Sequence, residues 1–257
     1  MAAEKPVAHV ICGYHPVEEA LRQGSRPLGT LFLATRRESS RTRHLSQLAR
    51  SLGIKVKFVD TRSLDRMTDS THQGVVATVE ARRALDLDDF LGRVEGKEGM
   101  VVVILDGVQD PHNLGAVLRN CSLNGAVAVI LPRDRTAGVT PTVEKVAAGA
   151  LEYVEVVKIG NLAAAMRKLK EKGFWITGAD PGGEVELPDA DFRGLTAIVI
   201  GDEHRGLRRL TKEHCDRLVK IPSTGRVASY NMATASGLFL FTAYLQQRHG
   251  SSSPSTK

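Results

Sequence analysis

The chain has 257 residues, with 35 lysines and arginines against 29 acidic residues, so its net charge is +6. A hydrophobic share of 42% and a charged share of 25% are ordinary for a globular protein, and the length allows one large domain or two modest ones. No apolar run approaches the roughly 20 residues of a membrane helix, and Cys12, Cys121 and Cys215 lie far apart without zinc-ligand spacing, which argues against a membrane protein, a disulfide framework and a metal site.

The first residues show no pattern of a signal or transit segment, so we expect a protein of the reducing cytoplasm.

The amino-terminal part alternates strands and helices. Strands are predicted at residues 7–11, 28–34, 54–59 and 75–79, with helices opening at Gly13 and spanning 41–52 and 64–67. This alternation predicts a small α/β domain over residues 1–80.

A second domain begins after a predicted linker at residues 81–97, where charged residues replace the β-branched ones. Apolar strands are predicted at 100–105, 126–131, 175–178, 196–200 and 218–221, with helices at 114–123, 162–172 and 232–248. Such a pattern indicates a parallel sheet buried on both faces, which we place in residues 98–249. Residues 250–257 carry nothing apolar and are expected to be a disordered tail.

The positive charge is concentrated between residues 22 and 50, where seven arginines face one acidic residue, Glu38. Such a cluster is typical of contacts with a phosphate backbone, although a solvated helix face has the same composition. The planar guanidinium group favours the phosphate interpretation. The cluster comprises Arg22, Arg26, Arg36, Arg37, Arg41, Arg43 and Arg50.

Three loops follow predicted strands, at the ends where ligands bind in parallel sheets. In residues 106–119, Asn113 is suited to cap a helix, and Arg119 can lie back over Gly115 towards the ligand crevice. Residues 200–207 place Glu203 between two glycines, and residues 221–231 contain Ser229 and Asn231. Taken singly, each loop is a weak signal, and a capping residue, a surface arginine or an exposed turn is the commoner explanation of such residues. Neither a dinucleotide-binding Gly-x-Gly-x-x-Gly after an early strand nor a Gly-Lys-Ser/Thr phosphate loop occurs.

Together the three loops are specific. They read Asp-Gly-Val-x-Asp-Pro-His-Asn-Leu-Gly-Ala-x-x-Arg, Gly-x-Glu-x-x-Gly-Leu and Ile-Pro-x-x-Gly-x-Val-x-Ser-x-Asn. This set resembles the three motifs of the SpoU/TrmH family of RNA ribose 2′-O-methyltransferases. Residues 13–21 and 72–77 are similar to that family's L30e-like RNA-binding domain, and the likeness is greatest to members that methylate a guanosine in large-subunit ribosomal RNA.

The resemblance implies a homodimeric enzyme that uses S-adenosylmethionine, with a carboxy-terminal SPOUT domain containing a deep trefoil knot. It implies that Gly201, Ile221 and Tyr230 hold the cofactor, and that the catalytic pocket is lined by Asn113, Arg119, Glu203, Ser229 and Asn231. Family proposals make Arg119 the base. Because an arginine side chain keeps its proton at neutral pH, we prefer a role in fixing a phosphate and stabilising negative charge on the ribose 2′-oxygen.

The chain departs from the usual motifs at Tyr230, Met232 and Ala233, and at His204 and Arg205. Arg205, with Arg208 and Arg209, adds positive charge beside the expected site, and we predict that Arg205 and Arg208 contact RNA. The expected substrate is 23S-type ribosomal RNA, free or in a pre-ribosomal particle. Transfer RNA, or RNA binding without catalysis in ribosome assembly, is the alternative.

Overall fold

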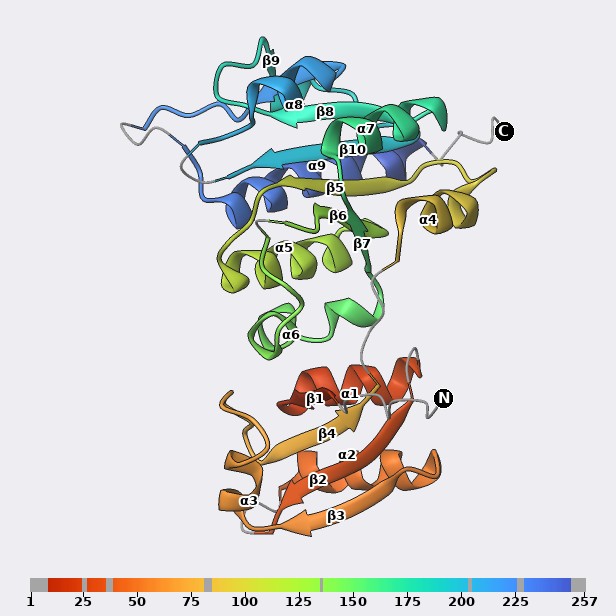
Figure 1. The fold of residues 1–257 in the computed structure, drawn as a ribbon, viewed down its shortest axis with the longest axis vertical. Helices are drawn as coiled ribbons and strands as arrows, with labels where there is room; N and C mark the ends of the chain where they lie inside the picture. Colours follow the sequence, from red (N-terminus) through yellow and green to blue (C-terminus); the bar gives the residue numbers. More distant parts are fainter. Residues whose placement is uncertain are drawn as a thin grey trace, which may run out of the picture. The chain divides into compact units, whose positions relative to one another are not determined.

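The computed structural model describes residues 9–24, 27–35, 39–80, 85–134, 136–202, 205–225 and 229–250, with side chains up to Arg248. These residues form two compact units (Figure 1). The first lies within residues 1–83 together with 138–152, and the second within 84–137 and 153–257.

The first unit is built on a four-stranded sheet in the order β1-β4-β2-β3. β2 and β3 are parallel, and the other neighbours are antiparallel. Two helices, α1 and α2, bury Val17, Leu21 and Leu45 against one face of the sheet, and Leu64 of α3 packs on the other. The elements are β1 His9–Cys12, α1 Tyr14–Gln23, β2 Leu28–Ala34, α2 Ser40–Ser51, β3 Lys55–Val59, α3 Thr61–Asp65 and β4 Val75–Val79.

The same unit contains the segment Gly138–Glu152, which forms α6 (Pro141–Ala147) and the short helix η1 (Ala150–Glu152). Thr140 caps α6 by accepting a hydrogen bond from the Val143 N–H at 3.3 Å. Gly149 has a φ of +93°, and a Cβ there would lie 2.6 Å from Cγ of Glu19 on α1. By sequence this segment falls in the predicted domain 98–249, whereas in the structure it packs on α1 and β1.

The second unit is a seven-stranded sheet in the order β7-β6-β5-β10-β8-β11-β9, in which every neighbouring pair is parallel. This confirms the predicted α/β fold class with a buried parallel sheet. The deep knot stays a prediction. The elements are α4 Leu87–Val94, β5 Val101–Asp106, α5 Pro111–Leu123, β6 Ala128–Pro132, β7 Glu155–Ile159, α7 Leu162–Glu171, β8 Trp175–Ala179, β9 Val185–Glu186, η2 Leu187–Asp189, β10 Thr196–Gly201, α8 Arg209–His214, β11 Arg217–Lys220 and α9 Met232–Gly250.

Helices cover both faces of this sheet. On one face α4 and α7 pack against residues such as Val102 and Ile104 of the central strand β5. Because side chains alternate along a strand, Val103 and Leu105 point to the opposite face. There α5 and α9 pack against each other and reach β6 and β10. The double cover explains why these strands read as continuous apolar runs.

Two features differ from the sequence interpretation. Residues 87–94 of the predicted linker form α4, capped by Asp86, whose side chain accepts a hydrogen bond from the Asp89 N–H at 2.9 Å. Its buried Leu87, Phe90, Leu91 and Val94 make a helical stripe that joins the core of the second unit. The sequence interpretation also places Trp175 in the core. In the structure Trp175 is the first residue of β8, and 52% of its surface is exposed.

Candidate active site

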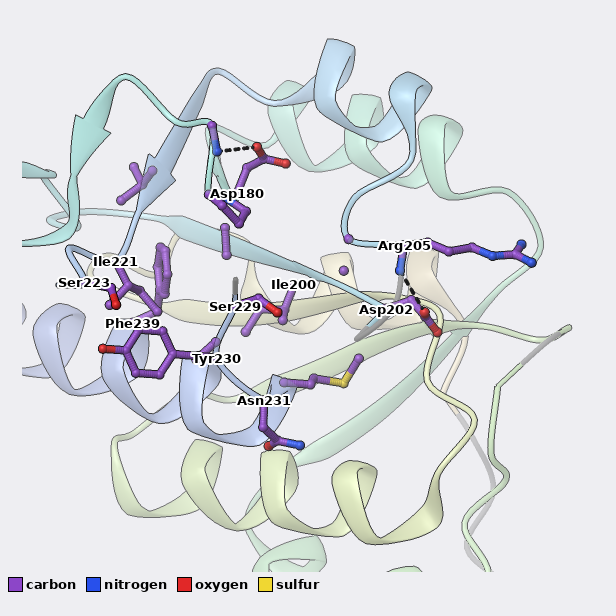
Figure 2. Close-up of a pocket in the computed structure, with 18 of the residues that line it drawn as sticks. Asp180, Ile200, Asp202, Arg205, Ile221, Ser223, Ser229, Tyr230, Asn231 and Phe239 are labelled. Carbon is purple, nitrogen blue, oxygen red and sulfur yellow. Dashed lines mark hydrogen bonds between the residues drawn. The ribbon is translucent and has the colours of Figure 1, made fainter. Parts of the chain in front are cut away.

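A pocket of about 720 Å³ lies at the carboxyl ends of β8, β10 and β11 and beside the start of α9 (Figure 2). In the sheet order these strands are contiguous, and β5 adjoins β10. The three loops singled out by sequence therefore leave the same edge of the sheet. Five of the predicted cofactor-binding and catalytic residues line the pocket, namely Gly201, Ile221, Ser229, Tyr230 and Asn231.

Gly201 sits where the chain turns back at the end of β10. The Gly206 N–H donates to the Asp202 carbonyl at 2.8 Å, and the Arg205 N–H donates to Asp202 Oδ1 at 3.2 Å. A Cβ on Gly201 would lie 2.2 Å from the carbonyl carbon of Gly206, a separation that no side chain tolerates. Glycine is therefore required at the start of this tight turn, which forms one rim of the pocket.

The pocket has apolar and polar walls. Ile200, Ile221 and Phe239 contribute apolar surface, while Asp180 and Asn231 lie at opposite ends in Figure 2. The Asp180 carboxylate accepts a hydrogen bond from the Gly182 N–H at 2.9 Å, and it pairs with Lys212 Nζ at 2.5 Å. Sequence reasoning missed Asp180, although its position directly after β8 could have indicated it.

Asn113 and Asn231 join the first and third loops. Asn231 Nδ2 donates to Asn113 Oδ1 at 3.1 Å, across 118 positions of sequence. Asn231 also begins α9, because its Oδ1 accepts from the N–H groups of Ala233 at 2.9 Å and Thr234 at 3.4 Å.

The prediction that Asn113 caps its helix is wrong. α5 begins two residues earlier, at Pro111, and Asp110 is the cap, accepting from the His112 N–H at 2.8 Å. That hydrogen bond lowers the pKa of the Asp110 carboxyl. Since the carboxylate caps the helix, the Asn113 amide is available for Asn231.

Of the other predicted residues that the structure describes, Arg205 alone lines this pocket. Arg119 is exposed on α5 and does not line the pocket, and neither does Arg208. Arg205 lines the pocket, but its side chain extends away from Ser229 (Figure 2). Glu203, Arg26, Arg36 and Arg37 lie outside the described residues.

Three predicted RNA-binding arginines lie on helices of the first unit. Arg22 Nη2 pairs with Glu18 at 2.5 Å, one helical turn away. The Arg41 guanidinium lies 5.7 Å from the centre of the Tyr14 ring, and Arg43 is exposed. Arg41 and Arg43 thus remain on an accessible face of α2, while the charge of Arg22 is partly balanced by Glu18.

The cysteines offer no thiolate nucleophile. Burial raises the pKa of Cys215 to about 12 and raises those of Cys12 and Cys121 as well. In the part of the chain that the structure describes, no group of His, Cys, Asp or Glu side chains is placed to hold a metal ion. The polar side chains that line the pocket include Asp180, Asp202 and Lys212 beside Ser229 and Asn231.

Comparison with known proteins identifies the family. The sequence model of the SpoU rRNA methylase family matches residues 100–241. The chain belongs to the SpoU rRNA methylase family. A second model, the substrate-binding domain of RNA 2′-O ribose methyltransferases, matches residues 10–85. Both matches confirm the family that the motifs predict, so the chain is an RNA 2′-O-methyltransferase.

Individual SpoU methylases are similar over nearly the whole chain. The 23S rRNA (guanosine-2′-O-)-methyltransferase RlmB of Pseudomonas syringae pv. tomato is 42% identical, with 95% of this chain and 98% of the relative covered. RlmB of Shewanella oneidensis is also 42% identical, over 93% of this chain and 98% of the relative. The solved SpoU methyltransferase AviRb from Streptomyces viridochromogenes, in complex with S-adenosylmethionine, superposes with a TM-score of 0.78 at 26% identity, covering 95% of this chain and 92% of AviRb.

SpoU methylases use S-adenosylmethionine, and the pocket suits it. About 720 Å³ is within the range of small-molecule sites. The wall of Ile200, Ile221 and Phe239 offers apolar surface to an adenine ring, and the bare backbone of Gly201 allows close approach. The Asp180 carboxylate offers an acceptor to the ligand's polar groups.

Replacing Asn231 by Asp separates its two hydrogen bonds. An aspartate keeps the oxygen that caps α9 but places an acceptor against Asn113 Oδ1. Because this hydrogen bond is exposed to water, we expect unchanged thermal stability. We expect a roughly tenfold loss in methyl transfer to RNA, because the first and third motif loops lose the hydrogen bond that joins them. Asn161→Asp is the matched control, because Asn161 caps α7 through a 2.9 Å bond from the Ala164 N–H, away from the pocket. Full activity of Asn231→Asp would show that the amide pair is dispensable.

Proposed function

We propose that the protein transfers a methyl group from S-adenosylmethionine to the ribose 2′-hydroxyl of a guanosine in 23S ribosomal RNA. The observation that carries this proposal is that the second and third motif loops line one pocket, and that the first loop is joined to it by the hydrogen bond between Asn231 and Asn113. Similarity to RlmB over 95% of the chain supports the choice of RNA.

Each side chain has a defined part in this reaction. Bound S-adenosylmethionine supplies the electrophilic methyl group. Gly201, Ile221 and Tyr230 hold the cofactor against the pocket wall, and Asn113, Ser229 and Asn231 orient the ribose with Glu203. Arg119 binds the phosphate of the target nucleotide and stabilises the negative charge that grows on the 2′-oxygen.

Arginines on both units bind the rest of the RNA. Those of residues 22–43 in the first unit and Arg205 and Arg208 in the second contact phosphates. The substrate is free 23S RNA or a pre-ribosomal particle in the cytoplasm, where bacterial ribosomes are assembled. No helix among the described residues is long and apolar enough to cross a membrane.

Mapping ribose methylation in total RNA tests the proposal. Cells with and without the gene are compared, and the deletion strain is complemented with the wild-type gene. We expect one guanosine in 23S RNA to lose its methyl group and to regain it on complementation. A loss of methylation confined to transfer RNA would show that transfer RNA, and not 23S RNA, is the substrate. An unchanged methylation map would indicate that the protein binds RNA without catalysis.

We further propose that the enzyme is a homodimer formed through α9. One face of α9 buries Phe239, Leu240 and Ala243, whereas another exposes a second apolar stripe. Exposed apolar side chains that gather on one face of a helix are typical of an interface. The stripe comprises Leu238, Phe241, Tyr244 and Leu245.

Phe241→Asp is expected to convert the dimer into a monomer, since it places a charge in the centre of this stripe. Phe241 is 53% exposed, so the substitution leaves the core of the protomer intact. Light scattering coupled to size-exclusion chromatography measures the mass. The control is Leu52→Asp, which charges a similarly exposed residue of the first unit (51%). A dimer that survives Phe241→Asp would place the interface elsewhere.

A further inference from the structure

A buried carboxylate ends the central strand β5. The Asp106 side chain is 0% exposed and lies in register with Gly201 of β10. Its Oδ2 accepts hydrogen bonds from the Arg208 N–H at 2.9 Å and the Thr211 hydroxyl at 2.6 Å. Its Oδ1 accepts none from the described residues. A buried carboxylate oxygen without a hydrogen-bond partner destabilises the folded state. The group that lies nearest to Oδ1 is therefore important.

That group is the guanidinium of Arg208. Its Nε lies 3.5 Å from Asp106 Oδ1. A Cβ built on Gly107 would lie 3.7 Å from Arg208 Nη2, so the guanidinium runs past the bare Cα of a residue with a φ of +107°. The arginine side chain is nevertheless half exposed, at 50%. One edge of the Arg208 guanidinium group thus faces the buried carboxylate, while its other N–H groups remain accessible to solvent.

Neighbouring arginines are held differently. Arg209 Nη1 pairs with Glu213 at 2.5 Å on the exposed surface of α8. Exposed ion pairs of this type contribute little to stability, so they hold a side chain only weakly in place. The Arg205 side chain extends into solvent beside the pocket (Figure 2). Arg208 therefore differs from both, because its acidic partner is fixed in the sheet.

We propose that Asp106 is a positioning residue that holds Arg208 so that its outer N–H groups bind a phosphate of the RNA substrate next to the reacting nucleotide. A guanidinium fork binds phosphate through two parallel hydrogen bonds, and a side chain already held in place loses less entropy on binding. This deepens the proposed function and rests on it only in taking RNA as the substrate.

Asp106→Asn tests the role of the ion pair. The amide keeps an oxygen for the Arg208 N–H and the Thr211 hydroxyl, but it places an NH₂ group against Arg208 Nε. We expect the Kd for a 23S rRNA transcript to rise by about tenfold, and the slope of log Kd against log salt to fall by about one. The Kd for S-adenosylmethionine is expected to stay unchanged, a result that general damage to the loop would not give.

A double-mutant cycle with Arg208→Ala decides whether Asp106 acts through Arg208. The double variant is expected to bind RNA no more weakly than Arg208→Ala alone. Thr211→Val is the matched control, because it removes a bond to Oδ2 and leaves the ion pair, so RNA binding should match the wild type. Additive losses in the cycle, or wild-type RNA affinity of Asp106→Asn, would overturn the proposal.

Arg208→Lys gives an independent measurement should Asp106→Asn not fold. Lysine keeps the charge but has no Nε to face Asp106, so its affinity for RNA should lie between those of the wild type and Arg208→Ala. Full rescue by lysine would overturn the proposal. All variants are measured on transcripts of 23S rRNA and of a transfer RNA. The cycle measures RNA affinity and not methylation. It therefore tests the role of Asp106 even if the 23S transcript is not methylated and the proposed substrate proves wrong.

Discussion

Arg119→Ala is expected to lower kcat for methyl transfer to RNA by about 10²- to 10³-fold, the loss typical of removing one donor that stabilises transition-state charge. The Kd for S-adenosylmethionine should remain that of the wild type, because Arg119 does not line the pocket. Stability should also be unchanged, since the side chain is exposed on α5. Single-turnover kinetics, calorimetric titration with cofactor and thermal unfolding measure the three quantities.

Two further variants sharpen this result. Arg119→Lys keeps the positive charge but loses the fork that binds phosphate at two points, so an intermediate rate is expected. Arg167→Ala removes another exposed arginine, on α7, and should have full activity. Near-normal methyl transfer by Arg119→Ala would exclude both the base and the phosphate-binding role of Arg119.

The edge of the sheet that carries the site could be predicted from strand direction. β5, β10 and β11 are short apolar runs, and parallel strands place their carboxyl ends at one edge. That Asn113 and Asn231 share a site was implied by the resemblance to the SpoU/TrmH motifs, and a 3.1 Å hydrogen bond joins the two side chains. The helix start at Asp110 was missed because Asn113 is an equally good capping residue by type.

Other features depend on tertiary contacts that no local pattern encodes. The acidic residues 86, 88 and 89 made the segment before β5 look like a linker, although the same Asp86 caps α4 and the apolar stripe behind it is buried. Residues 138–152 pack on α1 and β1, and the lack of a side chain at Gly149 allows the backbone to pass close to Glu19. Composition likewise could not show that Arg22 pairs with Glu18.

Gly201→Ala is expected to weaken S-adenosylmethionine binding by at least about tenfold and to destabilise the protein by about 1–3 kcal/mol, the usual cost of overpacking. The added methyl group would lie 2.2 Å from the Gly206 carbonyl carbon and 2.4 Å from the Leu207 nitrogen. Leu207 has little freedom to yield, because it is buried in the core and packs close to Gly178. The turn at Asp202–Gly206 must therefore move, and that turn forms a rim of the pocket.

The comparison that isolates this steric effect is Gly160→Ala. Gly160 follows β7, has no positive φ and has nothing within 4 Å of an added Cβ, so its substitution should change neither cofactor affinity nor stability. Calorimetric titration and urea unfolding are run on both variants. Since both lose one glycine from the unfolded chain, the difference between them measures the clash alone. Equal cofactor affinity in the two would mean that the turn at Gly201 is not needed to form the cofactor pocket.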